Sequence, residues 1–180
     1  MSNKNRAIFL DRDGVINKEA NYLSNPEDFE FIEGSIEALK TLKRKGYLLI
    51  IVTNQAGIAK GYFTEETLKE MHEKMNLILR QNGVLLDDIF YCPHHPEFTG
   101  PCNCRKPKPG MIFKAKEKFK INLEDSFIVG DTLNDIQTGI AARCKTALVL
   151  TGYGEDEQQK IGPVTPNLIF KNLLDFAKNI

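Results

Sequence analysis

The sequence between residues 7 and 14 reads Ala7-Ile8-Phe9-Leu10-Asp11-Arg12-Asp13-Gly14. Four apolar residues in a row predict a short buried strand, and the glycine after the two acids allows the backbone to turn away. In open parallel sheets, ligands bind where the strands reach their carboxyl ends. The acidic pair therefore marks a candidate site, provided that the rest of the chain forms such a sheet.

Further along the chain, short apolar runs alternate with longer segments of helical period, which is typical of βα units around a parallel sheet. The runs expected to form strands are 7–10, 47–52, 88–91, 127–129, 147–150 and a last short one at 167–170. Helices are expected from an N-cap at Ser35 to Gly46, from Thr64 to Gly83, and over 111–119, 133–143 and 173–176. We therefore expect an α/β fold with a Rossmann-like, doubly wound and mostly parallel sheet.

Composition excludes several classes of protein. The chain has 180 residues, of which 42% are hydrophobic, enough for one sizeable core but not for two full domains. Basic residues (24) and acidic residues (24) balance, so nothing attracts nucleic acid or an anionic membrane in general. No apolar run approaches the roughly 20 residues that span a membrane. We expect a single domain over residues 1–180, and a monomeric, cytoplasmic protein without a nucleic-acid or membrane partner.

Three later segments add polar groups next to expected strand ends. Thr53, Asn54 and Gln55 follow the second strand, Lys106 precedes an expected helix, and residues 130–135 carry a second acidic pair. Carboxylate oxygens suit Mg²⁺, while a hydroxyl, amides and a lysine suit phosphate oxygens. The four segments thus supply carboxylates, a hydroxyl, a lysine and a second pair of carboxylates. Together they predict a site for a metal ion and a phosphate group.

These segments resemble, in the same order, the four motifs of the haloacid-dehalogenase-like (HAD-like) phosphatases. They are Asp11-x-Asp13-Gly14, Thr53-Asn54-Gln55, Lys106 and Gly130-Asp131-x-x-x-Asp135. Residues 9–14, 53–59, 91–96 and 102–107 are similar to those of family members that act on D-glycero-D-manno-heptose 1,7-bisphosphate. Histidinol-phosphate phosphatases resemble the same pattern. The resemblance implies a HAD-like fold without a large cap domain and a cytoplasmic hydrolase of nucleotide-heptose biosynthesis.

The resemblance also implies catalytic roles. Asp11 would attack phosphorus and form an aspartyl-phosphate. Asp13 would protonate the leaving sugar oxygen and then take a proton from the attacking water. Thr53 and Lys106 would bind the oxygens of the transferring phosphoryl group.

Metal and substrate contacts are implied in the same way. Mg²⁺ would be held by Asp11, the backbone carbonyl of Asp13 and Asp131, with Asp135 in reserve. Residues 19–22 would form a flap over the sugar, and Thr132 stands where many heptose enzymes carry a lysine. The expected substrate-binding residues are Arg12, Glu19, Ala20, Asn21, Tyr22, Asn54, Gln55, Arg105, Lys106 and Thr132.

A cysteine-rich loop over residues 92–104 predicts a second metal site. Three thiols and an imidazole in two matched halves are the composition of a closed, structural Zn²⁺ site; they are Cys92, His94, Cys102 and Cys104. His94 is preferred to His95 because it repeats the one-residue gap of the second half. The alternative, three unconnected surface thiols, is less favoured because exposed thiols are reactive. His72 and Cys144 are expected to be core residues.

Three functions from different classes compete. The first is a Mg²⁺-dependent phosphatase that removes the 7-phosphate of the heptose bisphosphate, with Arg105 contacting the second phosphate and Lys106 the reacting one. The second acts on histidinol phosphate, whose cationic end calls for carboxylates rather than cations. The third is a non-enzymatic module, either a phospho-accepting receiver or a zinc-held interaction domain. A receiver carries its acceptor aspartate on a central strand, whereas here the third strand ends in Tyr91-Cys92.

Overall fold

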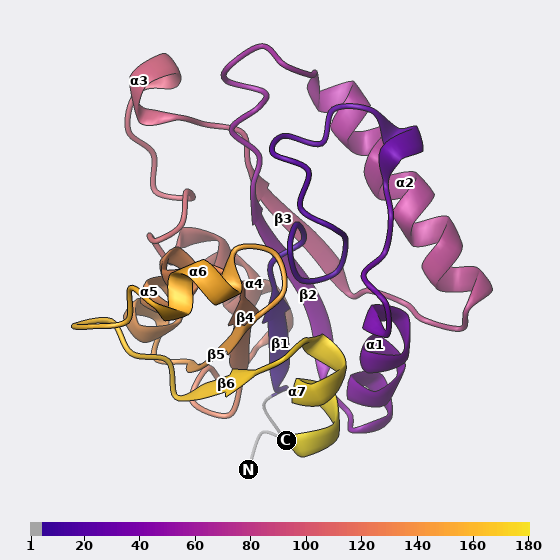
Figure 1. The fold of residues 1–180 in the computed structure, drawn as a ribbon, viewed down its shortest axis with the longest axis vertical. Helices are drawn as coiled ribbons and strands as arrows, with labels where there is room; N and C mark the ends of the chain where they lie inside the picture. The colour runs from indigo at the N-terminus through magenta and orange to yellow at the C-terminus, as the bar shows by residue number, and fades with distance from the viewer. Residues whose placement is uncertain (1–4) are drawn as a thin grey trace.

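A six-stranded, all-parallel sheet forms the centre of the computed structural model, which describes residues 5–180 (Figure 1). The strand order is β3-β2-β1-β4-β5-β6. The chain starts in the middle of the sheet, winds outward to β3, and then crosses back to build the other half. This arrangement confirms the doubly wound α/β fold.

The strands lie close to the expected positions. Their bounds are β1 Ala7–Leu10, β2 Leu48–Asn54, β3 Asp88–Cys92, β4 Phe127–Gly130, β5 Lys145–Val149 and β6 Leu168–Phe170. One difference affects the site: β2 continues through Thr53 and Asn54, which were expected to follow the strand. Their backbones pair with Tyr91 and Cys92 of β3, so both side chains project from regular strand rather than from a loop.

The helices also follow the expected pattern, with two short additions. Their bounds are α1 Ser35–Arg44, α2 Glu65–Gln81, α3 Pro96–Thr99, α4 Gly110–Phe119, α5 Leu133–Ala142, α6 Gly154–Gln158 and α7 Leu173–Asn179. The Thr64 hydroxyl caps α2 as expected, accepting a hydrogen bond from the Thr67 backbone N–H at 3.1 Å. The expected cap at Ser35 is wrong by one residue: Gly34 occupies the N-cap at φ 81°, a conformation that favours glycine.

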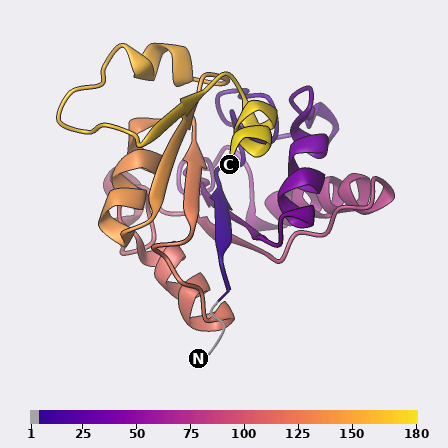
Figure 2. The same cartoon turned by 90° about the horizontal axis from the view of Figure 1, so that it is seen from below.

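Strand alternation divides the core between the two faces of the sheet. Ile8 and Leu10 of β1 pack with the helices α1, α2 and α7, whereas Ala7 and Phe9 pack with α4. Figure 2 shows the sheet between these helix layers, with α1, α2 and α7 on one side and α4 and α5 on the other. Both faces of the sheet are therefore covered, and its carboxyl edge is left for the connecting loops.

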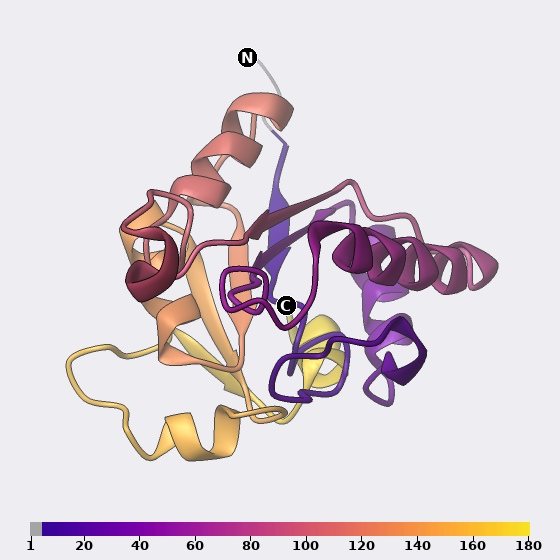
Figure 3. The ribbon, with the colours of Figure 1, turned by 90° about the horizontal axis from the view of Figure 1, so that it is seen from above.

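Figure 3 looks onto that edge, where the loops after β1, β2, β3 and β5 lie. The segment 11–34 between β1 and α1 contains only the short 3-10 helix Pro26–Asp28, which agrees with the absence of a large cap. Within residues 5–180, no helix is long and apolar enough to cross a membrane.

Candidate active site

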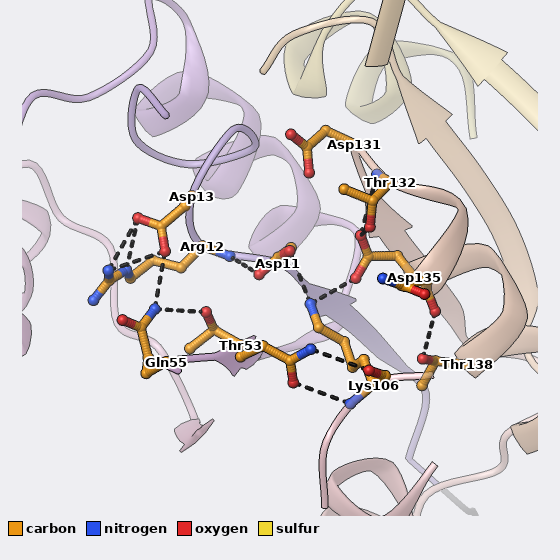
Figure 4. A network of polar contacts seen from close by, with 12 residues as sticks. Asp11, Arg12, Asp13, Thr53, Gln55, Lys106, Asp131, Thr132, Asp135 and Thr138 are labelled. Carbon is orange, nitrogen blue, oxygen red and sulfur yellow. Dashed lines mark hydrogen bonds and ion pairs between the residues drawn. The ribbon is translucent and has the colours of Figure 1, made fainter. Parts of the chain in front are cut away.

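The carboxyl edge of the sheet brings the four motifs together. Leu10 of β1 pairs with Ile51 of β2 on one side and with Val129 of β4 on the other. The residues just beyond these positions therefore converge on one point, as Figure 4 shows for Asp11, Thr53 and Asp131.

Three carboxylates form what we term the acidic centre: Asp11, Asp131 and Asp135. One oxygen from each lies within 4.8 Å of the others. The Lys106 ammonium lies between two of them, 2.8 Å from Asp11 Oδ2 and 2.6 Å from Asp135 Oδ1. All four side chains are largely or fully buried, so one lysine opposes three carboxylates with little exposure to solvent.

Burial and the excess of negative charge shift the pKa values of groups in the acidic centre. Burial, reinforced by the neighbouring carboxylates, raises the pKa of Asp11 to about 7 and that of Asp131 to about 8. Burial disfavours the charge of Lys106, but Asp11 and Asp135 outweigh it and raise the lysine pKa. The acidic centre would therefore gain from a second cation, and its three oxygen donors fit a hard divalent ion such as Mg²⁺.

Two glycines allow the Asp131 carboxylate to reach the centre. A Cβ atom at Gly14 or at Gly152 would lie 2.1 Å from Asp131 Oδ2, and both glycines have positive φ. The Tyr153 backbone N–H donates to the same oxygen at 2.9 Å. The loop after β5 thus belongs to the site, although the sequence analysis assigned no role to it. Its position after a strand end was the signal that could have identified it.

The Asp13 carboxylate is surrounded by hydrogen-bond donors. Arg12 Nη2 lies 3.0 Å from both carboxylate oxygens, Asn17 Nδ2 donates to Oδ1 at 2.9 Å, and Gln55 Nε2 donates to Oδ2 at 2.9 Å. Burial alone would raise the pKa of Asp13, but the Arg12 charge and these hydrogen bonds lower it below its usual value. The lowered pKa favours the carboxylate form of Asp13.

The side chains of Asn54 and Gln55 link the parts of the site by hydrogen bonds. The Asn54 side chain makes two hydrogen bonds to the Lys106 backbone, at 3.1 and 3.0 Å, and so ties the lysine loop to β2. Gln55 Nε2 also donates to the Thr53 hydroxyl at 2.9 Å. The threonine, the lysine and Asp13 are thus held in one network (Figure 4).

A cavity of about 200 Å³ opens beside Asp13. Glu19, Asn21 and Tyr22 of the expected flap contribute to its walls. The full lining is Asp13, Glu19, Asn21, Tyr22, Leu23, Asn54, Gln55, Ala56 and Tyr153. Asn21 and Tyr22 have φ values of 46° and 73°, an uncommon backbone conformation for these residues. Ala20 is exposed and is not part of the lining.

The cysteine-rich loop gathers the four expected ligands. Sulfur–sulfur distances from Cys92 are 3.6 Å to Cys102 and 3.1 Å to Cys104, and His94 Nδ1 lies 3.4 Å from Cys104 Sγ. Tetrahedral zinc bonds place ligand atoms about 3.5–3.8 Å apart, so the cluster could hold such an ion. His95 is engaged elsewhere, since its Nδ1 accepts from the Glu97 backbone N–H at 3.3 Å.

Comparison with known proteins agrees with this geometry. A family model described as HAD-hydrolase-like matches residues 103–176. The D-glycero-beta-D-manno-heptose-1,7-bisphosphate 7-phosphatase of Pasteurella multocida is 46% identical, covering 97% of this chain and 96% of that protein. The phosphatase of the same name from Escherichia coli K12 is 44% identical, covering 96% and 88%. This chain belongs to the heptose bisphosphate phosphatase family of HAD-like hydrolases.

A solved structure supports the assignment independently. The D,D-heptose 1,7-bisphosphate phosphatase from B. bronchiseptica, complexed with magnesium and phosphate, superimposes with a TM-score of 0.90 at 34% identity, covering 96% of each chain. Because the relatives are phosphatases, the non-enzymatic receiver and zinc-module hypotheses are set aside.

Two residues lie differently from what the family resemblance led us to expect. The Arg12 guanidinium is 1% exposed and faces Asp13 and His72 rather than the cavity, because it is the counterion of Asp13. The Thr132 hydroxyl donates to Asp135 Oδ2 at 2.6 Å at the start of α5, so it is also directed into the protein.

Arg105 contacts the cysteine-rich loop. Its Nη1 donates to the His94 carbonyl at 3.3 Å, which links the two halves of that loop beside Lys106. Two further residues, Asn17 and His72, were not expected at the site; they contact Asp13 and Arg12 respectively. Asn17 follows Gly14 by only three residues, and this proximity was a signal that could have identified it, whereas no pattern in the sequence places His72 near residues 11–14.

Proposed function

We propose that this protein is a Mg²⁺-dependent phosphatase that removes the 7-phosphate from D-glycero-D-manno-heptose 1,7-bisphosphate and releases heptose 1-phosphate and inorganic phosphate. The observation that carries the proposal is the acidic centre with Lys106, placed next to the Asp13 cavity. The substrate is that of the related heptose-1,7-bisphosphate 7-phosphatases.

Asp11 is the proposed nucleophile. Its carboxylate would attack phosphorus in line with the leaving sugar oxygen, forming an aspartyl-phosphate that water then hydrolyses. Lys106 and Thr53 would hold the oxygens of the transferring group, where negative charge must be stabilised. Asp11, the Asp13 backbone carbonyl and Asp131 would hold Mg²⁺, which supplies further charge neutralisation when bound.

Asp13 is the proposed general acid and base. In the unliganded site the lowered pKa favours the ionised form of Asp13. In the second step this carboxylate would accept a proton from the attacking water. A bound phosphate group adds negative charge beside Asp13 and raises its pKa, which favours the protonated form needed in the first step.

Zinc in the cysteine-rich loop is proposed as a structural ion. Cys104 is followed directly by Arg105 and Lys106, so an ion held at Cys104 would fix the base of the segment that carries both cations. Lys106 is already directed at the acidic centre, which leaves Arg105 as the proposed contact of the second phosphate. An arginine fork suits that contact because it can bind two phosphate oxygens together.

Histidinol phosphate is the second candidate substrate. Glu19 lines the cavity, and burial together with the nearby Asp13 raises the pKa of its carboxyl group. A cationic substrate would relieve that repulsion, whereas a second phosphate would not. The high identity to heptose bisphosphate phosphatases favours the bisphosphate.

Phosphate release from heptose bisphosphate, fructose 1,6-bisphosphate and histidinol phosphate distinguishes the candidates. We expect Mg²⁺-dependent turnover with the highest kcat/KM on heptose bisphosphate, loss of turnover with EDTA, and none with Asp11→Asn. A higher kcat/KM on histidinol phosphate would overturn the substrate while leaving the mechanism intact. No Mg²⁺-dependent release from any of the three would overturn the proposed function itself.

A further inference from the structure

The Arg12 guanidinium is a buried cation whose hydrogen bonds are shared between two side chains. Its Nε and Nη2 contact the Asp13 carboxylate at 3.3 and 3.0 Å, and its Nη1 lies 3.2 Å from Nε2 of His72. A guanidinium has only donors, and buried donors need acceptors. Among the hydrogen bonds of residues 5–180, Asp13 and His72 are the only acceptors of the Arg12 side chain.

This contact determines the state of the histidine. Because Arg12 can only donate, His72 Nε2 must be the acceptor, which places the ring proton on Nδ1. Burial and the Arg12 charge lower the pKa of His72 to about 3, so the ring is neutral. A histidine expected to be a core residue is therefore a fixed acceptor for a buried cation.

The ring is held in place from two sides. His72 lies on α2, is 8% exposed, and packs against Tyr91 of β3 with ring centroids 6.2 Å apart in an edge-to-face arrangement. Tyr91 is in turn held by a hydrogen bond from its hydroxyl to Glu65 Oε2 at 2.9 Å. The Nε2 atom thus has a defined position relative to the sheet.

We propose that His72 is a positioning residue: by accepting from Arg12 Nη1 it holds the guanidinium plane that orients the Asp13 carboxylate toward the leaving-group oxygen. The inference rests on the proposed phosphatase function, in which Asp13 protonates that oxygen. Asn17 and Gln55 each hold one Asp13 oxygen, but only Arg12 contacts both and so sets the plane of the carboxylate. Without an acceptor for Nη1, the guanidinium would rotate to find one and would move the carboxylate with it.

The choice of substrate separates this role from a merely structural one. A sugar alkoxide needs a proton when it leaves, whereas p-nitrophenolate leaves without one. Misplacing the acid should therefore slow phosphoryl transfer from a sugar phosphate and spare transfer from p-nitrophenyl phosphate. General damage to the fold or to the acidic centre would slow both.

The experiment measures single-turnover phosphoryl transfer from heptose 1,7-bisphosphate and from p-nitrophenyl phosphate in His72→Leu, His72→Gln and the control Glu73→Gln, an exposed neighbour of His72 on α2. Single turnovers isolate the first step from the later step in which Asp13 acts as a base. For His72→Leu we expect a loss of about tenfold or more on the sugar and less than about threefold on p-nitrophenyl phosphate. His72→Gln, which retains an acceptor oxygen, should recover most of the loss, and Glu73→Gln should match the wild type.

Equal losses on both substrates, or a His72→Gln variant as slow as His72→Leu, would overturn the inference. So would a His72→Leu variant with the wild-type rate on the sugar. If His72→Leu does not fold, Arg12→Lys replaces it in the experiment. Lysine keeps the positive charge but lacks the planar guanidinium that contacts both Asp13 oxygens. We expect the same larger loss on the sugar phosphate than on p-nitrophenyl phosphate. A wild-type protein that hydrolyses neither substrate would instead contradict the proposed function.

Discussion

The acidic centre and the cysteine-rich loop are two metal-competent clusters that are built in opposite ways. The acidic centre takes Asp11 and Asp131 from the ends of two neighbouring strands and Asp135 from the first turn of α5, and it contains its own cation, Lys106. The cysteine-rich loop takes all four ligands from residues 92–104 and has no cation among them. One cluster is held by the sheet, the other by a short length of chain.

This difference indicates what each metal would do. Removing a metal from the acidic centre leaves Lys106 in ion pairs with Asp11 and Asp135, and the surrounding strands are buried in the core. Removing a metal from the cysteine-rich loop leaves three thiols and an imidazole with no ion pair among them, in a segment whose one helix, α3, has four residues. We therefore expect the first metal to control chemistry and the second to control the order of its loop.

The largest expected effect tests the acidic centre directly. Asp11→Asn should lower turnover by at least about 10⁴-fold, because an amide cannot accept the phosphoryl group although it fills the same space. Thermal unfolding should be unchanged or should occur at a higher temperature, since a buried carboxylate is removed. The exposed Asp156→Asn is the matched control, with steady-state phosphate release as the measurement. Near-normal release from purified Asp11→Asn would exclude Asp11 as the nucleophile.

The next effect tests the cysteine-rich loop. Cys102→Ser/Cys104→Ser should abolish zinc binding and lower kcat/KM by about 10²-fold, because a disordered loop misplaces the segment that follows Cys104. Elemental analysis and hydrogen exchange over residues 92–106 report the metal and the loop order, and Cys144→Ala, a buried cysteine outside the loop, is the control. Unchanged kinetics without zinc would show that the two regions are independent.

A third prediction concerns Arg105, which joins the two regions. Arg105→Ala should reduce kcat/KM for the bisphosphate by about 30- to 150-fold, the value of a charge-assisted contact of about 2–3 kcal/mol. A monophosphorylated sugar should lose little, because it lacks the second phosphate. Steady-state kinetics on both substrates give the comparison. Equal losses would assign Arg105 to the loop structure, through its hydrogen bond to His94, instead of to substrate recognition.

The smallest expected effect is the pH dependence of metal-induced stability. The pKa values of Asp11 and Asp131, about 7 and about 8, lie above the ordinary value of 3.8. Protons on these groups therefore stabilise the metal-free fold at low pH, and this contribution is lost as the pH rises through both values. Mg²⁺ competes with those protons, so its stabilising effect should grow between about pH 5 and about pH 8.

Calorimetry with and without Mg²⁺ measures this effect. At about a hundredfold excess over Kd the gain should approach about 2–3 kcal/mol at the higher pH. The Asp11→Asn variant should show a smaller gain and a weaker pH dependence. A stabilisation that is constant over this pH range would mean that the acidic centre does not bind Mg²⁺ in competition with protons.

Much of the fold could be predicted because its signals are local. The run Ala7–Leu10 is apolar on both faces of the sheet, as a central parallel strand must be, and Thr64 followed by two glutamates marks the start of α2. Asp11, Thr53, Lys106 and Asp131 lie near strand ends or a helix start, and all parallel strands end at one edge. Their convergence followed from the topology without knowledge of any side-chain position.

Other features could not be predicted, because they depend on where two distant elements meet. Gly34 rather than Ser35 caps α1, since the left-handed turn there lies against Leu174 of α7. Tyr153 enters the site because the loop after β5 folds back onto Asp131.

The amino-acid sequence by itself determined which apolar runs form strands and which polar residues follow them. It also determined the acidic pair, the lysine and the cysteine spacing. Only the tertiary structure decided that Arg12 faces Asp13 and His72 rather than a substrate, and that Thr132 faces Asp135. The physical reason is that periodicity reports which positions are buried, whereas a buried charge or hydroxyl takes whichever partner the packing of other elements brings within about 3 Å.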